Sequence, residues 1–330
     1  MKTLICSYSS DSRTLYKADI YKVLSMPKGF IIHFRYKLKY VEELISNDIK
    51  TFLNQDVIIF YTITKNVEKE TNIPIRKAKL VRVDISEDTG LFHAYMELED
   101  FVNVELKEEK PTDKFFVNSD LKIINQDNKW FDKIEKVKNS FGDMLFYYIK
   151  DITTYKGKTI KATQRNDRKS STFKLKHGEK YFIELAIGNP KETDSKLKFE
   201  SSSDDITANI PNPMEITAQY DDKSIPIYIK TLDVSNASSF ISFNPTNSDD
   251  NVNTEYNLNI EIVKELGWKK PFFFGLLTLL TLIGFVLVKE GYDSLNRIFE
   301  WENSIDTGLI LGCALMTICP AILFFHYNKK

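Results

Sequence analysis

The chain has 330 residues, with 45 Lys and Arg against 46 Asp and Glu, and its formal net charge is -1 at pH 7. This balance predicts no partner by itself, so the distribution of charge along the chain is more informative. Cys6 stands alone and Cys313 and Cys319 lie in one apolar run, which excludes a disulfide framework. The first 17 residues lack the apolar segment of a secretory signal, and we therefore expect the front of the chain to stay in the cytoplasm.

Residues 1–106 predict an α+β domain, which we interpret as a cytoplasmic sensing domain. Its clearest pattern is 30–38, where apolar residues take every second position, the period of a strand with one buried face. Glu87 to Gly90 separate two apolar runs in the manner of a hairpin. The predicted elements are a short strand at 19–25, a strand at 30–38, a helix at 40–53, a strand at 56–64 and hairpin strands at 76–86 and 91–99.

The middle of the chain changes character twice. Residues 107–154 begin polar and mixed in charge, and they predict a linker with a short helix or strand. Over 155–266, short strand-like runs recur between Asn, Pro and Asp turns, a spacing typical of an antiparallel β-sandwich. The predicted strands lie within 172–187 and near 196–200, 205–209, 214–219, 225–232, 238–243 and 255–263.

Two apolar runs, 271–288 and 307–327, dominate the end of the chain, and neither contains Asp, Glu, Lys or Arg. Because a helix of about 20 apolar residues crosses a bilayer, they predict a C-terminal two-helix transmembrane hairpin within 267–330. The alternative is a buried hairpin in a soluble core. The acidic loop between the runs and the lysines outside them predict a multi-pass protein of the inner (cytoplasmic) membrane, with both termini in the cytoplasm.

The strand at 30–38 presents a basic face, which is the first candidate ligand-binding site. Between its apolar positions and just after it stand His33, Arg35, Lys37 and Lys39. A row of cations with aromatic neighbours matches a phosphodiester backbone whose bases can stack. The alternative is a solvated outer face, because lysines on strands often only protect an edge.

A second basic segment, 156–176, contains Arg165, Arg168 and Lys169, with Asp167 as its only acid. Such a segment binds anionic polymers by counterion release, or anionic lipid headgroups through the surface potential. The alternative is a flexible, solvated loop. We therefore include these three residues among the candidate ligand-binding residues.

The apolar runs contain small residues at helical spacing. Gly308 and Gly312 form a G-x-x-x-G pair, which lets helices approach closely in lipid. In the first run, Gly275, Thr278 and Thr281 recur at every third position and predict a packing face or a pore lining, of which packing is the safer interpretation.

Signatures of enzymes are missing from the sequence. The segment from Lys156 to Thr159 superficially resembles a phosphate loop, but its first glycine is replaced by Ile152. The four histidines show no metal-ligand spacing with the cysteines. We therefore predict no catalytic residue, no metal and no cofactor.

The order of parts and the runs GLLTLLTLIGFVLV and GLILGCALMTICPAILFF resemble the two-span membrane effectors of bacterial anti-phage defence. Among these the chain is most similar to the effector subunit of Hailong-type systems, through architecture and without a diagnostic motif. The resemblance implies a cytoplasmic domain that senses a nucleotide signal and spans that permeabilise the inner membrane. It also implies that short DNA oligomers, made by a partner nucleotidyltransferase, hold the effector closed.

Together these features predict a ligand-gated, oligomeric membrane effector, a pore or channel former controlled by an anionic nucleotide or oligonucleotide. Two helices per chain do not enclose a water path, so we expect a homo-oligomer, such as a tetramer, in the lipid bilayer. The alternative is a membrane-tethered scaffold or adaptor that recruits a protein partner without a pore. A membrane-bound enzyme would require an unrecognised site in the first domain.

Overall fold

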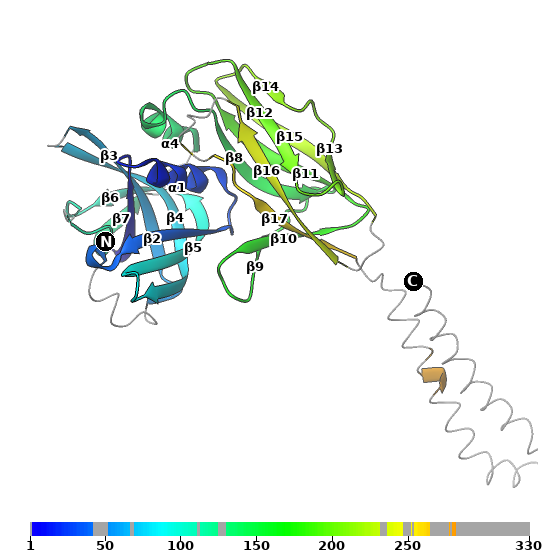
Figure 1. Cartoon of the computed structure of the whole chain (residues 1–330), viewed down its shortest axis with the longest axis horizontal. Helices are drawn as coiled ribbons and strands as arrows, with labels where there is room; N and C mark the ends of the chain where they lie inside the picture. Colours follow the sequence, from blue (N-terminus) through cyan, green and yellow to red (C-terminus); the bar gives the residue numbers. More distant parts are fainter. Residues whose placement is uncertain are drawn as a thin grey trace, which may run out of the picture. The chain divides into compact units, whose positions relative to one another are not determined.

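A computed structural model of the chain divides into two compact units, Met1–Lys264 and Glu265–Lys330 (Figure 1). The structure describes residues 2–41, 52–66, 69–110, 113–124, 130–231, 236–246, 252, 254–264, 277 and 279–281. In these residues strands far outnumber helices, and they form three sheets. The fold is therefore mostly β. This corrects the predicted fold class, in which an α+β domain was followed by an antiparallel sandwich and a transmembrane hairpin.

The predicted membrane segment needs the strongest correction. Among the residues that the structure describes, no helix has both the length and the apolar character needed to cross a membrane. On this finding the transmembrane hairpin and the inner-membrane location with cytoplasmic termini are wrong. The two runs, 271–288 and 307–327, lie outside the described residues except for Leu277 and 279–281. The prediction failed because hydropathy measures the composition of a run and not the helix that it forms.

The first part of the larger unit is a seven-stranded sheet in the order β2-β5-β4-β3-β1-β7-β6. Only β1 and β3 pair in parallel, and the other neighbours are antiparallel. The strands are β1 (Lys2–Ser10), β2 (Ile31–Lys37), β3 (Asp56–Asn66), β4 (Lys69–Ser86), β5 (Leu91–Phe101), β6 (Asn103–Leu106) and β7 (Phe116–Ile124). β7 lies within the predicted linker, which therefore contributes a strand to this sheet.

The helix α1 (Thr14–Ser25) follows β1 and replaces the short strand predicted at 19–25. It packs against β1, β2 and β4 of the first sheet and against β8 of the following part. Because it is covered on several sides, its buried residues do not form the single apolar stripe by which a surface helix is recognised. Most of the helix predicted at 40–53 lies outside the described residues.

The second part is a β-sandwich of a six-stranded sheet, β14-β12-β16-β17-β10-β9, and a four-stranded sheet, β13-β15-β11-β8. The pair β10 and β17 is parallel, so the sandwich is not purely antiparallel as predicted. Its strands are β8 (Phe146–Thr154), β9 (Thr163–Gln164), β10 (Ser171–Lys176), β11 (Lys180–Gly188), β12 (Ser195–Ser201), β13 (Ile206–Ala208), β14 (Met214–Ile216), β15 (Tyr220–Ile229), β16 (Asn236–Pro245) and β17 (Leu258–Val263). Two short 3-10 helices, η1 (Leu38–Tyr40) and η2 (Lys138–Ser140), and the helix α4 (Trp130–Val137) complete the described elements.

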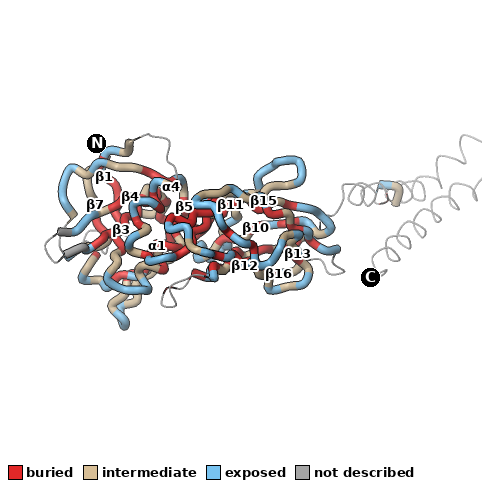
Figure 2. Tube along the Cα trace, turned by 90° about the horizontal axis from the view of Figure 1, so that it is seen from above, coloured by how far each residue is buried: buried red, intermediate tan, exposed pale blue. Residues whose placement is uncertain are grey.

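One continuous apolar core joins the first sheet to the sandwich, and the buried residues run from one part into the other (Figure 2). The helix α1 lies at this junction. The hydroxyl of Tyr256, before β17, donates to the carbonyl of Ala18, and Tyr21 donates to the carbonyl of Leu145 at 2.7 Å. The two parts are therefore coupled through the helix that follows β1.

Candidate functional site

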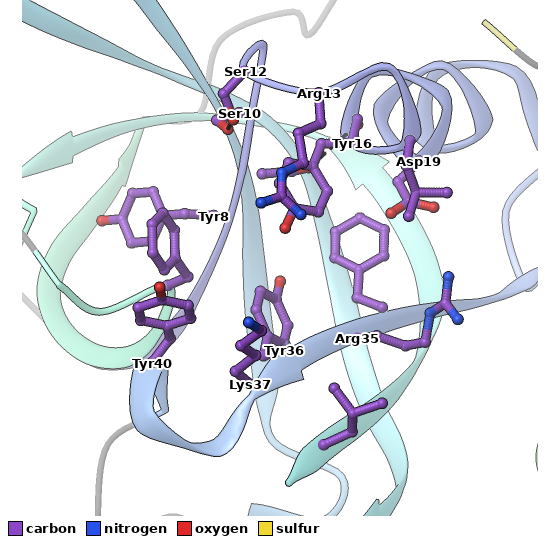
Figure 3. A pocket seen from close by; sticks show the side chains of 15 residues that line it. Tyr8, Ser10, Ser12, Arg13, Tyr16, Asp19, Arg35, Tyr36, Lys37 and Tyr40 are labelled. Atoms are coloured by element: carbon purple, nitrogen blue, oxygen red, sulfur yellow. Dashed lines mark hydrogen bonds between the residues drawn. The ribbon is translucent and has the colours of Figure 1, made fainter. Parts of the chain in front are cut away.

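A cavity of about 400 Å³ lies between the first turns of α1 and the edge strand β2 (Figure 3). This is within the usual size range of small-molecule sites. The side chains of Arg13, Tyr16 and Lys37 project toward the same space, while Asp19 and Arg35 lie together at one end. The residues that line it are Tyr8, Ser9, Ser10, Ser12, Arg13, Leu15, Tyr16, Asp19, Phe34, Arg35, Tyr36, Lys37, Tyr40, Leu91 and Phe115.

The turn from β1 into α1 forms one wall of the cavity. Asp11 fixes this turn, because its carboxylate accepts from the backbone N–H of Thr64 and its own N–H donates to the carbonyl of Thr62 at 3.1 Å. The hydroxyls of Ser10 and Ser12 lie 2.7 Å apart. The cavity therefore opens at the carboxyl end of a strand in a parallel pair, where ligands commonly bind in sheets with crossover helices.

The start of α1 carries an electropositive backbone. Arg13 occupies the N-cap position and makes no side-chain cap, and the first turn contains no acidic residue. The first N–H groups of a helix have no partner inside the helix, and together they carry about half a positive charge. An anion in the cavity would accept hydrogen bonds from these N–H groups and would interact favourably with their positive charge.

The cations of the cavity form no salt bridges in the described part of the chain, although the charge of Arg35 acts on the carboxyl of Asp19. Arg35 and Lys37 are exposed, and neither they nor Arg13 make a salt bridge there. Arg13 instead lies over the ring of Tyr16, with its Cζ 5.7 Å from the ring centroid. By contrast, Arg82 pairs with Asp84 at 2.7 Å. Three cations against one carboxylate give the cavity a positive potential.

Aromatic side chains form the floor and the far end of the cavity. The hydroxyl of Tyr36 lies 2.7 Å from Oγ of Ser7, and burial raises the pKa of Tyr36 well above its usual value. The Tyr40 ring meets Phe115 edge to face, with centroids 5.2 Å apart. These rings offer flat apolar surface beside the cations, the combination on which nucleobases stack.

Asp19 is the only acid that lines the cavity within the described residues. It is half-buried, and desolvation raises the pKa of its carboxyl to about 6, although Lys22 and Arg35 oppose this shift. A carboxyl with a perturbed pKa in a cavity wall is a frequent property of functional residues.

The structure separates the four residues predicted on the first basic strand. Arg35 and Lys37 line the cavity, whereas Lys39 lies beyond β2 in η1, with its Nζ 4.8 Å from the centroid of the Tyr40 ring. His33 contacts His93 and Tyr95 of β5 instead. Sequence reasoning did not select Arg13, Tyr16 or Asp19 as candidate site residues. The hydroxyl-rich SSDSRT turn was the available signal, but it required α1 to be recognised as a helix.

His33 is a poor ligand for an anion. Its Nε2 lies 2.9 Å from Nδ1 of His93, and its ring stacks on Tyr95 with centroids 4.5 Å apart. Burial lowers the pKa of His33 to about 4, and the neighbouring His93 and Arg35 act in the same direction. The ring is therefore neutral at pH 7.

The second predicted basic segment is used for packing between the two parts of the larger unit. Lys169 pairs with Asp84 at 3.1 Å, and Arg82 donates to the carbonyl of Asp167 at 2.8 Å. Arg165 lines a separate, polar cavity of about 470 Å³ beside β9 and β10. The backbone of Arg168 closes the turn by donating to the carbonyl of Arg165 at 2.8 Å. None of the three predicted residues, Arg165, Arg168 and Lys169, lines the first cavity.

Among the small residues predicted to pack or to line a pore, the structure describes only Thr281. Its hydroxyl donates to the carbonyl of Leu277 at 2.9 Å, one helical turn earlier. The other predicted residues, Gly275, Thr278, Gly308 and Gly312, lie outside the described residues.

Comparison with known proteins does not assign the chain to a family. No protein-family model matches it, and no curated protein is similar to it in sequence. None of these comparisons bears on the anti-phage effectors, so that resemblance stays a prediction.

Solved structures show only faint likeness. They include a GH5 xyloglucanase from Bacteroides ovatus in complex with a heptasaccharide, at 7% identity over 28% of this chain and 17% of that chain, with a TM-score of 0.19. A CsuC-CsuE chaperone–tip adhesion subunit complex from Acinetobacter baumannii matches at 13% identity over 28% of this chain and 54% of that chain, with a TM-score of 0.21. The Vibrio cholerae VesB protease matches at 8% identity over 59% of this chain and 46% of that chain, with a TM-score of 0.20. The chain thus spans about half or less of these proteins, and the TM-scores are too low to carry an argument.

Proposed function

We propose that the chain binds a nucleotide, or the phosphorylated end of a short oligonucleotide, in the cavity between α1 and β2. The observation that carries this proposal is a set of three cations around one cavity with aromatic walls: Arg13, Arg35 and Lys37, none of which makes a salt bridge in the described residues. Phosphate oxygens are the natural partners of Arg13, of Lys37 and of the uncapped start of α1, and Arg35 can donate to a phosphate oxygen or to a base. The rings of the cavity suit a stacked base.

The position of α1 supports a sensing role for this site. Its first turns line the cavity, and its later residues contact the sandwich through the Tyr21 and Tyr256 hydroxyls. A ligand shifts a conformational equilibrium only through a difference in affinity between two states. A shift of α1 on ligand binding would alter contacts with both parts of the larger unit, which is the requirement for a ligand-controlled effector.

The role in anti-phage defence and the partner nucleotidyltransferase stay predictions of the resemblance. The homo-oligomer also stays a prediction, and it was argued from two helices that do not enclose a water path alone. The membrane-embedded pore is not proposed, because it depended on the transmembrane hairpin.

The test is calorimetric titration of the purified full-length chain with 5′-phosphorylated tetradeoxynucleotides of mixed sequence. We expect the double variant Arg35→Glu/Lys37→Glu to bind at least about 100-fold more weakly, since two charged hydrogen bonds at about 1.5–3 kcal/mol each are lost. The matched control is Lys156→Glu/Lys158→Glu, which reverses two exposed cations outside the cavity and should bind like the wild type. Equal affinities of both double variants would overturn the proposal.

A further inference from the structure

Asp19 stands out among the cavity residues because its carboxylate has no assigned role in holding the fold. Within the described part of the chain, it makes no hydrogen bond to a side chain or backbone group and no salt bridge. It follows Tyr16 by three positions on α1, which puts both side chains on the same face of the helix. Arg35 lies at the same end of the cavity (Figure 3). The carboxylate oxygens of Asp19 are not fully buried, so they are open to the cavity and can accept from a ligand.

Four charged or titratable groups surround Asp19, and they come from three places in the chain. Lys22 lies on the same helix, Arg35 and Tyr36 on β2, and Tyr256 before β17. Burial raises the pKa of Asp19 to about 6, against the opposing effect of the two cations. At pH 7.5 the group is therefore mostly ionised, and it then accepts hydrogen bonds without donating any.

We infer that Asp19 is a specificity-determining residue, which selects nucleobases that carry an exocyclic amino group over thymine and uracil. This inference rests on the proposed function. Adenine, cytosine and guanine each present an amino group that donates to a carboxylate. Thymine and uracil lack this amino group, and their one donor on the same edge, N3–H, lies between two carbonyl oxygens. A carboxylate that accepts from N3–H therefore also faces a carbonyl oxygen, which places two acceptors opposite each other.

The layout of the cavity is consistent with this assignment. Arg13 and the start of α1 lie at the phosphate-binding wall, while Asp19 lies at the end marked by Arg35. Arg35 supplies donors next to the Asp19 acceptor, so this end matches a base edge with an amino group beside a ring nitrogen or carbonyl acceptor. A hydrogen bond to a charged group contributes enough free energy for at least tenfold discrimination.

The experiment measures affinities of the full-length chain for dAMP, dCMP, dGMP and dTMP at pH 7.5, with wild type and Asp19→Asn. We expect the wild type to bind the three amino-bearing nucleotides about tenfold or more tightly than dTMP. The asparagine keeps the size of the side chain, but its amide both donates and accepts. It should therefore reduce the preference to about threefold or less, mainly by weakening the amino-bearing nucleotides.

A second measurement does not depend on the variant. Lowering the pH from 7.5 to 5 protonates Asp19, so the wild-type ratio of dAMP to dTMP affinity should fall at least threefold. The phosphate groups of the two nucleotides titrate alike, and their contribution cancels in the ratio. The ratio of Asp19→Asn should stay constant over this range.

The outcomes separate the two proposals. The role of Asp19 is overturned if the wild type binds all four nucleotides equally well, or if its preference is unchanged by Asp19→Asn and by pH. Either result leaves the proposed binding site intact. Wild type that binds none of the four, nor the tetranucleotides, overturns the proposed function itself. A preference that disappears with both the substitution and the lower pH supports the inference.

Discussion

Two groups of cations in the first part of the chain have opposite surroundings. Arg76 on β4 is fully buried, and its guanidinium donates to the carbonyls of Glu99 at 2.6 Å, Met26 at 2.6 Å and Val23 at 2.9 Å. Its Cζ also lies 4.4 Å from the centroid of the Phe101 ring. In the cavity, Arg35 and Lys37 are exposed and make no salt bridge in the described residues.

The difference shows that basic residues serve two purposes in this sheet: Arg76 stabilises the fold, and the exposed cations of the cavity are available to a ligand. Burial of Arg76 removes its guanidinium from water and lowers its pKa to about 10. The same guanidinium donates hydrogen bonds to carbonyl groups near the end of α1. The cavity cations are solvated and satisfy nothing in the described fold. Removing Arg76 should therefore affect stability, and removing cavity cations should affect ligand binding.

The largest expected effect is that of Arg76→Met. Methionine fills a similar volume but leaves three buried carbonyl contacts unmade, each worth roughly 1–3 kcal/mol. We expect the free energy of unfolding to fall by about 3–5 kcal/mol in urea denaturation. The matched control, Arg165→Met, removes an arginine side chain at the surface and should change stability by less than about 0.5 kcal/mol. If the two variants lose similar amounts of unfolding free energy, Arg76 does not stabilise the fold more than an exposed arginine does.

A smaller effect is expected for Asp19→Asn, and its sign depends on pH. Folding raises the pKa of Asp19 from 3.8 to about 6, so the folded state holds the proton more tightly than the unfolded state. This contribution to stability is fully present below pH 4 and is lost as the pH rises through 6. Asparagine does not titrate.

The measurement is the unfolding free energy of wild type and Asp19→Asn at pH 4 and pH 7. The variant should gain about 1–2 kcal/mol relative to wild type between these values, after allowance for solvent screening of a half-buried group. A difference that is constant with pH would show that Asp19 titrates normally, and would remove one argument for its function.

The smallest expected effect is on the unfolding free energy when either of two lysines is replaced. Lys77 pairs with Glu99 at 2.9 Å and with Asp56 at 3.1 Å, whereas Lys37 has no such partner in the described residues. We expect Lys77→Met to lower the unfolding free energy by about 1 kcal/mol and Lys37→Met to change it by less than about 0.5 kcal/mol. If Lys37→Met is the more destabilising of the two, Lys37 has a structural role and the comparison fails.

Local periodicity identified β2, the strand that contributes Phe34, Arg35, Tyr36 and Lys37 to the cavity. Ile32, Phe34 and Tyr36 are buried and Arg35 and Lys37 are exposed, as predicted by alternation in a strand with one covered face. The same reasoning failed for α1, whose residues 19–25 were predicted as a strand. A helix buried on several sides loses its one-sided pattern, and a short apolar run then fits either structure.

The sequence by itself determined the alternating basic strand and the many short strands of the second part, because side-chain alternation and turn residues are local properties. The tertiary structure alone decided that β1 and β3 lie in parallel and that the segment around 116–124 joins the first sheet. It also decided that Arg13 and Asp19 line the same cavity as Arg35. These features depend on contacts between residues distant in the chain, and such pairings are fixed by the packing of the whole core rather than by any local pattern.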